Sequence, residues 1–207
     1  AGFVPGLQVE SVEGRLLGPL EIRGLSFDSE SVHVEVDRAR LDWSPRALWI
    51  NRLRVRDLDI GHVIVQTKPT PPDDKPMTVP HELPLGLRLR RVAVQRLELR
   101  LDPAQPPVMI EAIELKGRWS GNRIRLDRLA ATVPELGPLV AEGAATLEPE
   151  RVVLRPLRVQ GPGAAELNGE LGYTGDFDLR LDWKDLHWPP QGESVLRSAA
   201  GSAASRS

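Results

Sequence analysis

Residues 53–65 read Leu-Arg-Val-Arg-Asp-Leu-Asp-Ile-Gly-His-Val-Ile-Val, and the spacing of their apolar residues decides the fold class. On a helix, which turns about 100° per residue, apolar residues at this spacing would point in many directions and bury no single face. On a strand, a step of two keeps one face, whereas a step of three keeps it only where a bulge or turn absorbs the extra residue. The stretch alternates the two steps, at Leu53, Val55, Leu58, Ile60, Val63 and Val65.

The same spacing recurs over much of the chain and predicts an all-β fold. It is clearest in a second run, at Leu87, Leu89, Val92, Val94, Leu97, Leu99 and Leu101. Charged and amide residues fill the positions between, as expected for a sheet with one face in water. We therefore expect many short strands, or longer strands broken by bulges, that turn one apolar side inward. From the spacing alone, an open trough and a closed sandwich are equally good interpretations.

Local signals divide the chain and place one helix. Ser44 followed by Pro45 is a helix-start signal, and predicts one short helix near 44–49. Five prolines in residues 67–80 favour an extended loop. The expected segments are an N-terminal β segment (1–66), a Pro-rich loop or insertion (67–82), a continuing β segment (83–190) and a flexible tail (191–207). Residues 67–82 are a domain boundary or an insertion in one continuous sheet.

Composition and motifs indicate a protein that is not an enzyme. Lys and Arg number 27 against 29 Asp and Glu, so no net basic charge points to nucleic acid. Cysteine is absent, which excludes a thiol enzyme and a cysteine-based metal site. None of the four histidines has a partner at metal-ligand spacing, and no phosphate-binding or nucleophile motif is present. We expect no catalytic residues, no metal and no cofactor.

Membrane signals are also weak within these residues. No stretch approaches the roughly 20 apolar residues of a membrane-spanning helix. The first six residues lack the basic and apolar regions of a signal peptide. We therefore expect the chain to be a piece of a longer protein.

Several stretches follow one another along the chain: Val4–Leu16, Pro19–Phe27, Val32–Val36, Leu41–Leu48, Leu53–Ile60, Leu83–Leu87 and Leu179–Pro189. In this order they resemble the TamB family, within the wider AsmA-like group of bridge-type lipid transfer proteins. The resemblance covers roughly residues 3 to 190 and rests on apolar and turn patterns.

The resemblance implies an elongated, antiparallel-rich sheet curled lengthwise into a trough, a β-taco, with an apolar interior. It implies a periplasmic protein, anchored to the inner membrane when full-length, that shields phospholipid acyl chains for transport between the inner and outer membranes. Its partners would be phospholipid acyl chains and a TamA-like outer-membrane protein reached through a C-terminal region outside this sequence. The alternative is a binding module that assists outer-membrane protein assembly by adding a client strand to its sheet edge.

A lipid-binding groove would use the inward apolar positions of the strands. A charge on this track would face an acyl chain that cannot solvate it. The residues predicted to line the groove are Leu87, Leu89, Leu97, Leu99, Leu101, Ile124, Leu126, Leu179 and Leu181.

Overall fold

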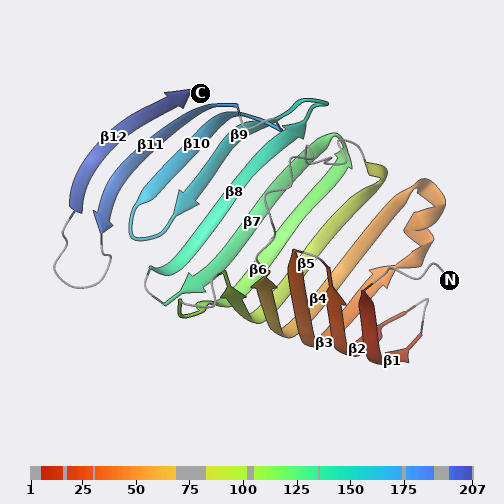
Figure 1. The fold of residues 1–207 in the computed structure, drawn as a ribbon. Coiled ribbons are helices and arrows are strands. Elements are labelled where there is room, and N and C mark those ends of the chain that lie inside the picture. The colour runs from red at the N-terminus through yellow and green to blue at the C-terminus, as the bar shows by residue number, and fades with distance from the viewer. Residues whose placement is uncertain are drawn as a thin grey trace.

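The chain folds into a single curled sheet of twelve strands, taken in sequence order from one edge to the other (Figure 1). The computed structural model describes residues 6–15, 18–29, 31–68, 83–101, 105–134, 136–173, 176–188 and 196–206. All substantial contacts between strands in these ranges join neighbours in the sheet. The expected all-β, open, mostly antiparallel architecture is confirmed.

Most strands are long. Their bounds are β1 (Leu7–Gly14), β2 (Leu20–Asp28), β3 (Val32–Ser44), β4 (Arg52–Thr67), β5 (Leu83–Arg100), β6 (Val108–Gly121), β7 (Arg123–Val133), β8 (Gly137–Leu147), β9 (Arg151–Gln160), β10 (Ala164–Gly172), β11 (Phe177–Trp188) and β12 (Leu196–Arg206). Of the two possibilities that the spacing left open, long strands broken by bulges are correct.

The bulges explain how steps of three keep one face. In β4, Val55 and Leu58 are three apart, but they lie opposite Trp43 and Leu41 of β3, which are two apart. The extra residue sits in a bulge, so Val55 and Leu58 remain on one side of the sheet. One-sided shifts of the same kind occur in β5 between Leu89 and Val92, in β7 between Leu126 and Leu129, and in β9 between Leu154 and Leu157.

The ladder of backbone hydrogen bonds is also interrupted near the middle of β2 and β3. In β2, Gly24 is absent from the ladders on both sides and has φ 60°. In the neighbouring strand β3, the side chain of Asp37 accepts hydrogen bonds from the backbone N–H of Arg38 at 2.5 Å and of His62 at 2.7 Å. A carboxylate thus satisfies backbone donors where the ladder is interrupted.

The expected short helix is present as a 3-10 helix, η1 (Pro45–Ile50). Pro45 occupies its start, where a missing N–H costs nothing. Asn51 ends it in the left-handed conformation, with φ 51°.

The one parallel pair of the sheet is β4 with β5; the other pairs are antiparallel. Parallel neighbours need a long crossover between them, and the Pro-rich stretch supplies its length. β4 ends at Thr67 and β5 begins at Leu83, so the predicted loop 67–82 separates these strands, and its residues 69–82 lie outside the described ranges. The sheet itself continues from β4 to β5.

The C-terminal region departs from the sequence-based expectation. We expected a flexible tail over 191–207, but Leu196–Arg206 forms β12 and pairs with β11. Small residues at Ser198, Ala200, Ser202 and Ala204 take ladder positions opposite β11. Low complexity in the side chains did not prevent strand formation, because the backbone of a neighbouring strand offers hydrogen bonds to any sequence other than proline.

Two glycines allow a test of the close approach of β10 to β11. Gly169 has φ 140°, and a Cβ there would collide with the backbone carbonyl of Asp178, whereas Gly121 has φ 55° with open space around it. Gly169→Ala should lower the free energy of unfolding by about 3 kcal/mol or more. Gly121→Ala should cost only about 1 kcal/mol. Urea unfolding of both variants measures the difference, and equal losses would contradict the described register.

Candidate functional site

One face of the sheet carries apolar residues in register from edge to edge; we call it the apolar face. Residues directly opposite each other on neighbouring strands share a face. Tracing these partners gives a rung that crosses all twelve strands without a charged residue: Gly14, Leu20, Leu41, Leu58, Val92, Leu115, Leu129, Ala141, Val159, Ala165, Trp183 and Gly201.

Six of the residues predicted for the groove lie on two further rungs of this face. Leu87, Ile124 and Leu179 belong to one rung, joined through Trp119, Ala145, Leu154 and Gly169. Leu89 and Leu126 belong to the next rung. Leu181 continues that rung through Leu167 and Leu157, which lies against Gly143 of β8.

The other three predicted residues lie farther along the chain. Leu97 pairs with Val63 and Ile110, and Leu99 pairs with Val65 and Val108, so both belong to aliphatic rungs. These rungs lie beyond Gln95, which is absent from the ladders on both sides of β5. Leu101 lies past the end of β5 and is 62% exposed. The register therefore does not bring Leu101 into a rung with the others.

The apolar face is open among the described residues. Large side chains on it are only half-buried, and Leu181 is 39% exposed. Buried hydrophobic residues are few and mostly small: Ala39, Ala47, Val55, Ala93 and Leu147. In the described part of the chain no second layer contacts this face. The closed sandwich, which the spacing allowed, is therefore excluded for these residues.

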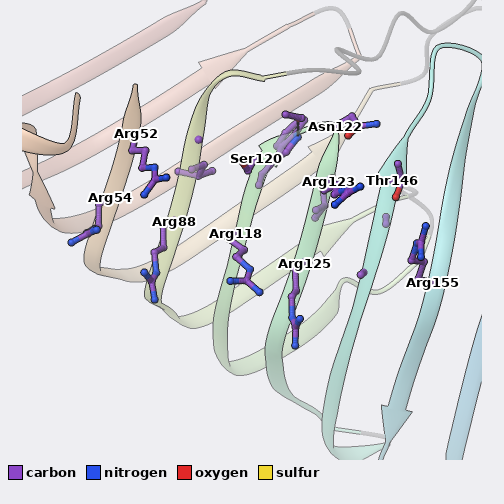
Figure 2. A pocket seen from close by; sticks show the side chains of 17 residues that line it. Arg52, Arg54, Arg88, Arg118, Ser120, Asn122, Arg123, Arg125, Thr146 and Arg155 are labelled. Carbon is purple, nitrogen blue, oxygen red and sulfur yellow. Dashed lines mark hydrogen bonds between the residues drawn. The ribbon is translucent and has the colours of Figure 1, made fainter. Parts of the chain in front are cut away.

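The opposite face, which we call the charged face, carries a row of like charges. Arg54, Arg88, Arg118 and Arg125 lie directly opposite one another on β4 to β7, and Arg155 of β9 follows across Ala144. Figure 2 shows Arg54, Arg88, Arg118 and Arg125 on four neighbouring strands, with Arg155 beyond one further strand. We call them the arginine row. Arg88 is flanked by Leu87 and Leu89, which places the row opposite the apolar rungs.

Sequence reasoning missed the arginine row and one apolar patch. The row depends on strand register, which no single stretch of sequence reveals. The patch lies on η1, where Trp49 is 91% exposed and Ile50 is 62% exposed. The sequence did not predict this exposure, because a helix of six residues is too short for its apolar spacing to show which side chains face water.

No group of His, Cys, Asp and Glu within the described ranges could hold a metal ion. Among the same residues, no helix is long and apolar enough to span a membrane.

His33, on β3, lies between two carboxylates: its Nδ1 is 2.9 Å from Asp28 and its Nε2 is 2.9 Å from Glu35. The hydrogen bonds with Glu35 and then Asp28 raise the pKa of His33 above its ordinary value. Lys68 also binds Asp28, and these two cations lower the pKa of that carboxyl.

Comparison with known protein families finds a match to a family described as TamB, N-terminal domain, over residues 1–136. The matched residues make up more than half of the chain and include β1 to β7. A search among curated proteins finds no match.

The carboxylates around His33 predict a pH dependence. A raised folded-state pKa means that the charged cluster stabilises the fold fully below the unfolded pKa of about 6.5. This stabilisation is lost as the pH rises through the folded pKa of His33. NMR titration should give a midpoint above that of a model histidine. The melting temperature should fall across the same interval, and His33→Gln should remove the dependence. A midpoint at or below the ordinary pKa would contradict the cluster.

Proposed function

The chain belongs to the TamB family, and from this membership we propose that its apolar face shields phospholipid acyl chains during transport between membranes. The family gives the protein a role in biogenesis of the cell envelope and a place in that envelope. The acyl-chain role goes further and rests on the sheet itself.

The observation that carries the proposal is an apolar face that nothing covers in the described chain. A soluble protein rarely leaves a contiguous apolar surface of this extent in water unless the surface binds something. Here it extends through every strand, while buried hydrophobic residues are few and mostly small among the described residues. We infer that an apolar ligand covers this face.

An acyl chain fits this surface by its energetics. Exposure of one methylene to water costs about 0.8 kcal/mol, so a 16-carbon chain costs on the order of 13 kcal/mol. A carrier must cover the chain over its whole path. Within a rung, Leu, Ile, Val and Ala residues follow one another from strand to strand at a spacing of about 4.8 Å, so the rung offers that cover continuously. A single deep pocket would not.

The remaining elements of the proposal follow from the family. The protein acts in the periplasm, and a longer form of it is anchored to the inner membrane and meets a TamA-like outer-membrane partner. Its action is binding, with no catalytic step and no cofactor.

A second candidate function has its own support in the sheet edges. Within the described residues, β1 pairs only with β2 and β12 only with β11, so each offers a free ladder. An extended client segment can add to such an edge through backbone hydrogen bonds. This activity would assist outer-membrane protein assembly, and it is compatible with an occupied apolar face.

A charge on the apolar face tests the acyl-chain role. Leu126 is half-buried at the centre of the sheet, and Leu126→Met is the matched control. Leu126→Asp should leave the protein folded, because water reaches this face, and should weaken binding of a neutral fluorescent monoacylglycerol at least about tenfold. Leu126→Met should bind as the parent chain does. Thermal melts establish folding before binding is measured.

Two results would count against the proposal. If Leu126→Asp unfolds the chain, the residue belongs to a closed core. If it folds and binds the probe with unchanged affinity, the apolar face is not the binding surface.

Strand addition predicts a different protection pattern. Hydrogen exchange of the backbone amides in β12 should slow on addition of an extended peptide from an outer-membrane β-protein, because those amides gain partners. A proline-substituted peptide serves as the control. Unchanged exchange at both β1 and β12 would rule out strand addition at these edges.

A further inference from the structure

The arginine row differs from other arginines of the sheet in its partners. Arg91 contacts Asp57 of the neighbouring strand at 2.7 Å, and Arg158 contacts Glu166 at 3.0 Å. In the row, Arg54 faces Arg88, which faces Arg118. Like charges directly opposite one another destabilise a sheet. The row therefore costs stability.

Most members of the row have no carboxylate partner among the described residues. Only Arg125 has one, Asp127 at 3.1 Å. The row lines a cavity of about 940 Å³, which seven arginines and no Asp or Glu surround. The two arginines beyond the row, Arg52 and Arg123, lie one ladder step nearer the strand ends. The electrostatic potential in this cavity is positive, and an anion would relieve the repulsion.

The shape of the row identifies the kind of anion. Five inter-strand steps of about 4.8 Å separate Arg54 from Arg155, so the row is roughly 24 Å long. A single small anion is held by side chains that converge on one point. A line of guanidinium groups, each able to grip a phosphate with two parallel hydrogen bonds, suits several phosphates in succession.

The surroundings of the row favour phosphates attached to lipid. The cavity lining also includes Leu87, Trp119 and Ile124 of the apolar rungs, so it reaches the strand ends where the two faces meet. The exposed Trp49 and Ile50 precede Arg52, the first arginine of the lining, by three and two residues. Tryptophan beside arginine is typical of surfaces that contact the headgroup region of a membrane.

We propose that the arginine row binds the phosphate groups of anionic phospholipids at a lipid surface. This site lies on the face opposite the proposed acyl-chain track and does not depend on that track. Its ligand is the headgroup, and its contribution is to hold the rim of the sheet against anionic lipid.

The test compares two double variants, one with a change in each of β5 and β6 and the other with both changes in β5. Arg88→Gln with Arg118→Gln removes the centre of the row. Arg91→Gln with Arg96→Gln is the matched control, because it removes the same charge from arginines that are ion-paired with Asp57 and Glu111. Binding of the 207-residue chain to phosphatidylcholine vesicles, with and without phosphatidylglycerol, is measured by co-sedimentation.

We expect the parent chain and the control to bind the phosphatidylglycerol vesicles. The row variant should bind them at least about tenfold more weakly, because each arginine near an anionic surface contributes a factor of about five. Folding is not in question, since relief of like-charge repulsion should leave the melting temperature of the row variant equal to or above that of the parent.

Equal binding by all three proteins would overturn the proposal, as would equal weakening by both double variants, which would indicate general charge alone. Calorimetric titration with inorganic phosphate distinguishes the source. If phosphate binds the row and the vesicles do not, free phosphate is the ligand and the lipid assignment is wrong. Monoacylglycerol binding should be unchanged in the row variant, so this result is separate from the fate of the acyl-chain role.

Discussion

The backbone ladder between neighbouring strands holds this molecule together, because in the described chain no second layer packs against either face of the sheet. In most domains, two layers bury their apolar faces against each other. Here the strands pair in sequence order through all twelve, and their side chains remain half-buried. The fold is thus specified by the register of the strands, and the apolar face remains exposed and able to bind a ligand.

Register also explains why the two faces have such different characters. A bulge lets Val55 and Leu58 share a face although they are three residues apart, whereas Arg54, next to Val55, belongs to the other face. Leu87 and Arg88 are neighbours in the chain, yet they belong to separate surfaces that each run across several strands. The arginine row and the uncovered apolar face are both costly to a free protein, and they lie on opposite faces of the same strands.

The fold class was predictable from sequence because steps of two and three cannot serve a helix, and the family resemblance rested on the same residues. The groove residues were partly predictable: a period of two identifies Leu87 and Leu89 as sharing a face, but cannot show that Ile124 and Leu179 lie on the same rung. Leu101 was included because it continues the period, although β5 ends one residue earlier. Two features were not predictable: the parallel pairing of β4 with β5 and the strand at the C-terminus. Both depend on which strand lies alongside in the sheet, and the local spacing of residues does not reveal that. The arginine row needed register for the same reason.

The order of the strands has a consequence for how such a protein changes in evolution. Since each strand in the described ranges makes its substantial contacts with the strand before it and the strand after it, the sheet is close to a one-dimensional array whose stability is a sum over neighbours. Gain or loss of one hairpin would alter its length by about 10 Å and leave its cross-section unchanged. A lineage could therefore change the length of the molecule by duplication alone, without redesigning a core.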